Sequence, residues 1–186
     1  MNPLRITQLF ILLLICNIGR GQEKSVYKLK SGKVSFSSFS AQELIHASSN
    51  QLKGLIDPNK KTFAFSIEII SFMGFNSELQ REHFNENYME TPVYPIATYL
   101  GKIIEDIDLQ QNGEYNVRAK GKLKIHGVEQ ERIVKTQITC KDGTITIHSL
   151  FNVLLSEHNI KIPRIVNNKI SNNINITVDA IFVRST

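Results

Sequence analysis

Few side chains in this sequence combine the type and the spacing that chemistry requires. No two histidines lie three or four residues apart and none neighbours Cys140, so the spacing of a metal site is missing. There is also no Gly-x-Ser-x-Gly elbow, no glycine-rich phosphate loop and no paired-carboxylate motif. We therefore expect no catalytic residue, no metal ligand and no cofactor. The five histidines are His46, His83, His126, His148 and His158.

His83 has the most informative neighbours of the five. It lies in a segment that we expect to be helical, because residues 77–80 resemble a capping box and Pro92 and Pro95 follow. There the ring could hydrogen-bond a quinone oxygen or a pyrophosphate, or it could be an ordinary structural histidine. Aromatic and aliphatic residues recur through this segment near helical spacing: Phe75, Leu79, Phe84 and Tyr88.

Two other reactive residues favour structural roles. His126 precedes Gly127, which is typical of a turn residue rather than of a catalytic base. Cys140 has no obvious activating partner and lies near the end of an apolar run, so we expect a small buried residue there.

The elements that must position these residues are mostly β-strands. Apolar Phe63, Phe65 and Ile67 alternate with smaller or polar residues, so one face of that strand is strongly apolar. Turn signals separate such runs: the proline turn at residues 57–60, and the dipeptides Asn112-Gly113, His126-Gly127 and Asp142-Gly143. The expected strands are residues 33–36, 51–56, 62–70, 99–109, 114–125, 133–140, 144–155 and 174–182.

These runs predict an all-β fold, an eight-stranded antiparallel barrel with one or two short helices. A second helix, after Ser40, would span residues 41–47. Closing the sheet removes the exposed edges that an open sheet would present. A barrel of this size either fills with its own side chains or holds one small ligand, and periodicity does not choose between these two.

The N-terminus has the pattern of a secretory signal. Arg5 precedes an apolar run at residues 9–15 that is too short to span a bilayer. Gly19 and Gly21 are small residues two apart, so we expect cleavage after Gly21 and a signal peptide at residues 1–21.

The remaining residues, 22–186, should form one exported domain, located in the periplasm. A lipoprotein anchored through Cys16 is the alternative, which the bulky Ile15 before it disfavours. The exported chain would keep a single cysteine and could form no internal disulfide. The formal net charge is +5, but the cations are scattered and interleaved with acids, which argues against a nucleic-acid partner.

Four short segments resemble the YceI-like family. They are Ser71-Phe72-Met73, Glu82-His83-Phe84, residues 94–99 with Gly101, and residues 121–128. The last contains the pattern Gly-x-Leu-x-x-His-Gly-Val intact, and the resemblance extends over residues 26–183. It implies an extended, lipocalin-like barrel that is exported to the periplasm and holds a polyisoprenoid chain in its cavity.

An apolar interior suits such a ligand, because each buried CH₂ contributes roughly 0.8 kcal/mol. The candidate contacts are inward-facing strand residues and the aromatic residues around the helix, with His83 beside them. For any one of them plain core packing is the simpler explanation, so the hypothesis concerns the set. It comprises Phe63, Phe65, Ile67, Phe72, Phe75, Phe84, Tyr88, Ile147, Phe151 and Val153.

The resulting prediction is an exported lipid-binding protein, a carrier or store for an isoprenoid lipid such as a quinone, and not an enzyme. Two alternatives stay open: a ligand-free periplasmic interaction or stress barrel, and a lipid-modifying enzyme. Transient contact with a membrane and homodimer formation also stay open.

Overall fold

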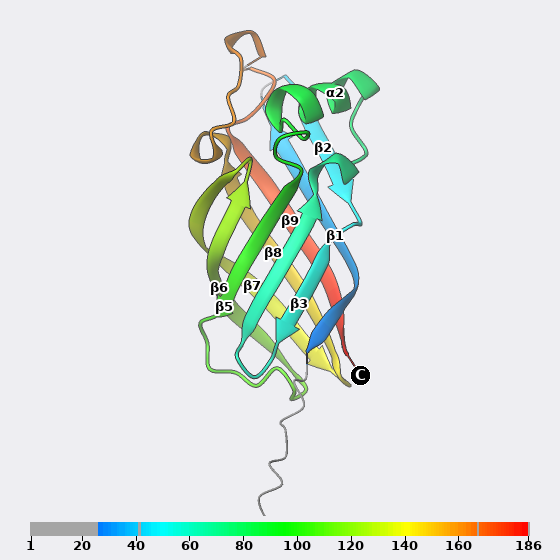
Figure 1. The fold of residues 1–186 in the computed structure, drawn as a ribbon, viewed down its shortest axis with the longest axis vertical. Helices are drawn as coiled ribbons and strands as arrows, with labels where there is room; N and C mark the ends of the chain where they lie inside the picture. The colour runs from blue at the N-terminus through cyan, green and yellow to red at the C-terminus, as the bar shows by residue number, and fades with distance from the viewer. Residues whose placement is uncertain (1–25, 41, 167, 186) are drawn as a thin grey trace, which may run out of the picture.

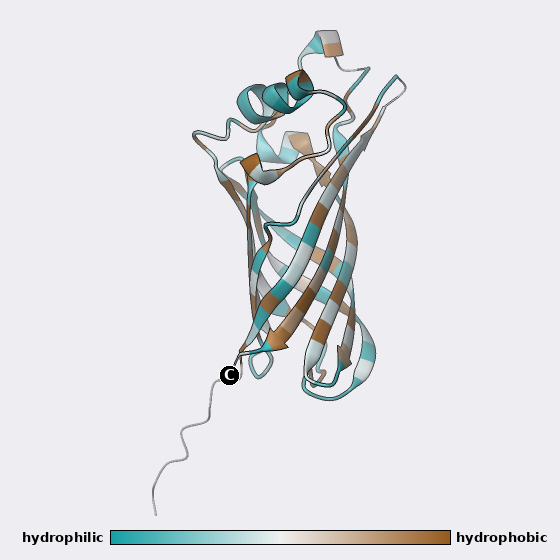
Figure 2. Ribbon diagram, turned by 90° about the vertical axis from the view of Figure 1, so that its right-hand side faces the viewer, coloured by the Kyte–Doolittle hydropathy of each residue, from teal (hydrophilic) through white to brown (hydrophobic). Residues whose placement is uncertain are grey.

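The strands close into a barrel, which confirms the predicted fold class. The computed structural model describes residues 26–40, 42–166 and 168–185, so the expected signal peptide and Cys16 lie outside the described residues. The described chain forms a closed eight-stranded antiparallel barrel with one extra strand and a single short helix (Figure 1). Apolar and polar residues alternate along its strands, as the sequence pattern predicts (Figure 2).

The pairing of the first and last strands makes the sheet a ring. Strand β1 pairs with β9 along most of its length, from Tyr27 opposite Arg184 to Ser38 opposite Ile174. The extra strand, β2 (Leu44–Ser49), pairs with β1 and makes one isolated bridge, between Ser48 and Met73. The barrel strands are β1 (Tyr27–Phe39), β3 (Lys53–Asp57), β4 (Thr62–Glu68), β5 (Ile96–Ile103), β6 (Gly113–Ile125), β7 (Val128–Lys141), β8 (Thr144–Leu154) and β9 (Asn173–Arg184).

Three of the predicted turns are confirmed. The proline turn joins β3 to β4, and the carboxylate of Asp57 accepts the backbone N–H groups of Asn59 and Lys60. His126-Gly127 and Asp142-Gly143 each form a two-residue turn with φ near +50° and +74°. Positive φ at both positions is the geometry whose twist matches paired strands.

The predicted turn at Asn112-Gly113 is wrong. Strand β5 ends at Ile103, and residues 104–112 form a long connection before β6, in which Gly113 already pairs with Cys140. This connection carries Leu109, which is 1% exposed, into the end of the barrel. Burial of that side chain therefore decides the path of the loop, and the Asn-Gly propensity does not.

The predicted second helix is also wrong, because residues 44–47 belong to β2. Ile45, Ala47 and Ser49 alternate with exposed residues, and pairing with β1 buries them. The tertiary pairing thus outweighs a weak helical signal.

The predicted helix at residue 77 onward is confirmed as α2 (Glu78–His83), continued by a π turn, η2 (Phe84–Tyr88). Ser77 caps the helix by accepting the N–H of Gln80, and the Gln80 side chain accepts the N–H of Asn76. In a standard capping box the second bond would come from residue 77 itself, so this version reaches one residue further back.

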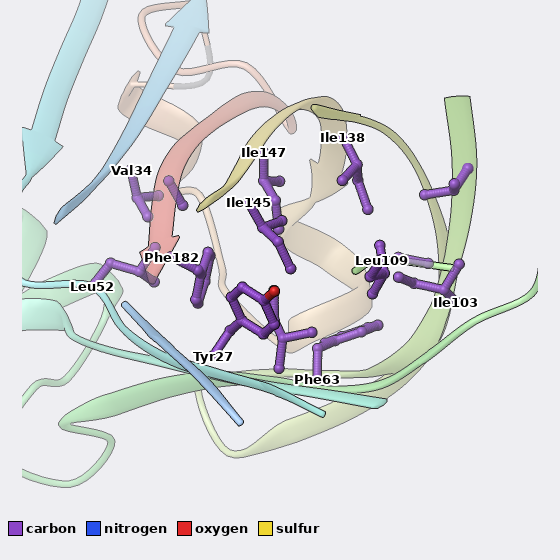
Figure 3. Close-up of a cluster of buried hydrophobic side chains, with 14 of the residues drawn as sticks. Tyr27, Val34, Leu52, Phe63, Ile103, Leu109, Ile138, Ile145, Ile147 and Phe182 are labelled. Atoms are coloured by element: carbon purple, nitrogen blue, oxygen red, sulfur yellow. The ribbon is translucent and has the colours of Figure 1, made fainter. Parts of the chain in front are cut away.

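Large side chains fill the end of the barrel that lies opposite α2 (Figures 1 and 3). Phe182 and Ile145 are fully buried there and lie on paired positions of β9 and β8. Tyr27, Ile56 and Leu109 pack in the same cluster. We call this cluster of five residues the plug. Cys140 is buried beside it, which agrees with its predicted role. Burial, and to a smaller extent the nearby Asp108 carboxylate, raises the pKa of its thiol.

The two glycine turns provide a first test. Both glycines have φ near +74°, but a Cβ at Gly127 would lie 2.6 Å from the Tyr94 ring, whereas nothing lies within 4 Å of one at Gly143. Gly143→Ala should lower the free energy of unfolding by about 1 kcal/mol, the conformational cost alone. Gly127→Ala should lower it by about 3 kcal/mol, because the Tyr94 ring must also move. Denaturant unfolding of both variants measures the difference, and equal losses would contradict the contact with Tyr94.

Candidate functional site

An apolar cavity of about 610 Å³ occupies the barrel between the plug and α2. Side chains from every barrel strand line it. All the residues predicted from the sequence lie on its wall: Phe63, Phe65, Ile67, Phe72, Phe75, His83, Phe84, Tyr88, Ile147, Phe151 and Val153. The structure thus brings the whole set to one cavity, and their contact with a ligand stays a prediction.

Sequence reasoning missed other parts of the wall. The alternating runs of β6 and β9 were recognised as strands, but their inward residues were not assigned to the cavity. The signal was present, because an alternating strand of a closed barrel must point one set of side chains inward. The missed residues include Val34, Phe36, Ile45, Val117, Leu123, Ile138, Ile174, Ile176 and Val178.

Two opposed glycines bring β5 and β6 close together at the middle of the barrel. Gly101 of β5 lies directly opposite Gly121 of β6. A Cβ at Gly101 would overlap the carbonyl of Lys120, and one at Gly121 would overlap the carbonyl of Leu100, so only glycine permits the two strands to approach this closely. Ala97 and Ala119, on the same two strands, are the neighbouring small residues of the wall.

Tyr99 covers this glycine pair from inside. Its hydroxyl donates to the carbonyl of Ala119 at 2.6 Å, across the position of Gly121, and its ring lies 4.9 Å from that of Phe63. Burial raises the pKa of Tyr99 to about 12, although backbone hydrogen bonding and Arg132 oppose the shift. The phenol is therefore neutral at physiological pH and acts as an anchored part of the apolar wall.

Four phenylalanine rings gather at the mouth of the cavity, beneath α2. Phe36 of β1 contacts Phe72, Phe75 and Phe84, with ring centroids 5.4, 5.9 and 5.3 Å away. These edge and offset contacts attach the segment before α2 and the start of the π turn to the barrel. The aromatic residues therefore position the helix as well as line the mouth.

Polar groups on the cavity wall are few. Thr136 and Ser149 are buried midway and hydrogen-bond to each other at 2.9 Å. At the rim, Glu43 accepts a 2.8 Å hydrogen bond from Gln80. His83 is also at the rim, where its side chain is exposed. Within the described residues, no group of three or more His, Cys, Asp or Glu side chains is arranged to hold a metal ion.

A buried histidine pair fastens the segments that follow α2 to the barrel. His126 Nδ1 donates to the carbonyl of His158 at 3.1 Å, and its Nε2 lies 2.7 Å from the Glu90 carboxylate. His158, fully buried, donates from Nδ1 to the carbonyl of Val128. We call Glu90, His126 and His158 the clasp, because they join three separate segments at the mouth.

Burial shifts the titration of His158. Loss of hydration lowers the pKa of His158 below its ordinary value of 6.5, and hydrogen bonds to backbone carbonyls oppose the shift only in part. Its Nε2 is buried without a partner among the described residues, so a proton there would be unsolvated.

Comparison with known proteins gives a family and a fold. A family model described as the YceI-like domain matches residues 27–182. No curated protein matches the sequence. No helix in the described part of the chain is both long and apolar enough to cross a membrane.

Three solved structures resemble the barrel. A polyisoprenoid binding domain from Saccharophagus degradans, implicated in plant cell wall breakdown, has a TM-score of 0.73 at 16% identity, over 86% of this chain and 98% of that one. BcnA from Burkholderia cenocepacia has a TM-score of 0.67 at 18% identity, over 81% and 95%. A YCEI protein from Campylobacter jejuni has a TM-score of 0.53 at 20% identity, over 70% and 78%.

The buried histidine makes stability depend on pH. Below pH 6.5 the unfolded chain protonates this residue while folded His158 stays neutral, so the unfolded state binds more protons and stability falls as the pH falls. His158→Asn keeps a donor near Nδ1 but cannot titrate, and it should remove a slope of up to about 1.4 kcal/mol per pH unit. Denaturant unfolding between pH 5 and 7.5 measures this slope. The control is His46→Asn, at an exposed position of β2, and an unchanged slope in His158→Asn would contradict the assignment.

Proposed function

The chain belongs to the YceI-like family, and from this membership together with the apolar cavity we propose that it binds one polyisoprenoid lipid inside the barrel. The cavity carries the proposal, because an eight-stranded barrel need not contain one. The ligand class is taken from the description of the Saccharophagus domain, whose fold this chain shares.

The wall fits the tail of such a lipid. Apolar residues from every barrel strand line it, and its buried polar side chains are hydrogen-bonded, Thr136 to Ser149 and Ser38 to the N–H of Ser171. About ten buried CH₂ groups would contribute roughly 8 kcal/mol, equivalent to micromolar binding before the entropic costs of association. The lipid tail therefore needs no polar contact with the protein.

A lipid with a neutral head group would point its tail toward the plug and its head toward α2. The plug closes one end with bulky side chains, whereas the rim at α2 offers Gln80, His83 and Glu43 as hydrogen-bonding groups. A quinone is one head group of suitable size and polarity for this rim.

The biological role that we assign is that of a carrier or store in the periplasm. Export is proposed from the N-terminal sequence alone. The role as carrier or store is proposed because α2 and the π turn enclose the cavity. Catalysis is not part of the proposal, because the titratable groups of the described wall are dispersed: Glu43, His83 and Lys169 at the rim, with the phenols of Tyr88 and Tyr99. The ligand-free alternative is disfavoured by the volume of the cavity.

Lipid extraction tests the proposal directly. Protein purified without detergent should carry a bound isoprenoid, visible as a mass shift in native mass spectrometry and identified after extraction. Delipidated protein should take up an added isoprenoid quinone with a stoichiometry of one. Folded protein that neither carries nor takes up any isoprenoid would overturn the function and favour the ligand-free barrel.

Replacing an alanine by tryptophan, once inside the cavity and once on the outer surface, tests where the lipid binds. Ala97 lines the cavity, whereas Ala64 lies exposed on the outside of the neighbouring strand. Ala97→Trp fills the cavity and should weaken uptake by roughly tenfold or more, while Ala64→Trp should leave it unchanged. Circular dichroism verifies that both variants fold, and equal uptake by both would place the lipid elsewhere.

A further inference from the structure

The barrel wall parts between β1 and the strand beside it. On that side, β1 pairs with β3 at Tyr27 and Lys28, and with β2 from Val34 to Phe39. No ladder pair joins residues 29–33 to residues 50–54 between these two stretches. Equal numbers of residues are left out on both sides, so the strands separate and rejoin in the same register. A β-bulge next to Lys30, where the register with β9 shifts, lies in the same stretch.

A groove of about 370 Å³ lies outside this gap. Leu52 forms its floor, and Leu52 also lines the main cavity, so this side chain is shared by both. It is 8% exposed and lies at the border of the buried cluster, on the side of Val34 and Phe182 (Figure 3). A Cβ at Gly32 would lie 2.9 Å from the Leu52 side chain, so glycine makes room for it. A single leucine therefore separates the cavity from the groove at this point.

The groove differs from the mouth in charge. Among the described residues, its lining contains Lys28, Lys30 and Lys53 and no acid. Lys53 lies 2.8 Å from Glu68, but neither Lys28 nor Lys30 forms an ion pair with a described residue. At the mouth, the negative charge of Glu43 offsets the positive charge of Lys169. An anionic group is thus attracted to the groove and not to the mouth.

We propose that this groove is a lateral entrance to the cavity, gated by Leu52, at which Lys28 and Lys30 bind the phosphate group of an isoprenyl phosphate. The proposal rests on the proposed function and names a ligand class for it. The tail passes Leu52 into the apolar cavity while the charged group stays in water on the lysines. A lipid of this kind never has to bury its charge, which is the main cost of moving it into a barrel.

Competition binding tests the anion site. The neutral dye N-phenyl-1-naphthylamine reports occupancy of the cavity, and geranylgeranyl pyrophosphate and geranylgeraniol compete for it with the same tail. The pyrophosphate should compete roughly tenfold better with the wild-type protein, because charge-assisted hydrogen bonds add to the same apolar contacts. Lys28→Ser with Lys30→Ser should abolish this preference and leave geranylgeraniol unchanged.

The matched control is a double lysine-to-serine variant that removes the same charge from another part of the surface. Lys135 and Lys141 are exposed on the outside of β7, away from the groove. Lys135→Ser with Lys141→Ser should retain the preference for the pyrophosphate. If all proteins bind the two compounds equally, the anion site is wrong and the proposed function survives. If neither compound displaces the dye, the proposed function itself fails.

Exchange kinetics test the gate. Leu52→Ala should accelerate release of the dye roughly tenfold in stopped-flow measurements, because it removes the side chain between cavity and groove. Ile145→Ala removes a buried plug side chain that itself lines neither the cavity nor the groove, and it should leave release unchanged. Unchanged release in Leu52→Ala, or equal acceleration in both variants, would overturn the lateral entrance.

Discussion

The closure of β1 onto β9 is the constraint on which the rest of the structure depends. Once the sheet is a ring, every second residue of every strand must share one interior, and the sizes of those residues decide how it is filled. Phe182, Ile145 and Leu109 fill one end completely. Small residues of the wall, among them Ala97 and Ala119, leave the middle open. The barrel therefore has a solid end and a hollow end. Alternation alone does not show whether such a barrel is filled by its own side chains or has room for a ligand.

The architecture was accessible from the sequence because it rests on local signals. Alternation at Phe63, Phe65 and Ile67 and the turn at Asp142-Gly143 act over a few residues, and both predictions are confirmed. The predictions were wrong where contacts with residues distant in the sequence determine the local structure. Pairing with β1 makes residues 44–47 a strand, and the burial of Leu109 draws out the loop that Asn112-Gly113 was expected to close.

The candidate site was partly predictable for the same reason. Its inward-facing residues follow from periodicity, and the aromatic residues near α2 follow from helical spacing. The gap beside Leu52 has no such signal, because it arises where two pairings of β1 fail to meet. The clasp was equally hidden, since Glu90, His126 and His158 come together only when three separate segments fold over one end. His126 was recognised as a turn residue, but its partners lie more than thirty residues away in either direction.

The two glycine turns have the same backbone geometry and opposite surroundings. The turn at Gly127 is held by Tyr94 and the clasp, whereas nothing lies within 4 Å of a Cβ at Gly143. The same end of the barrel brings Tyr27 and Arg184 together as a pair, next to the position where Thr144 pairs with Val183. A circular permutant that joins β9 to β1 and begins at Gly143 would therefore cut the chain at a residue against which nothing packs, next to Asp142, which hydrogen-bonds to Asn112. The molecule can in this way be opened at its solid end, and the hollow end can be presented unchanged at the surface of a fusion partner or sensor.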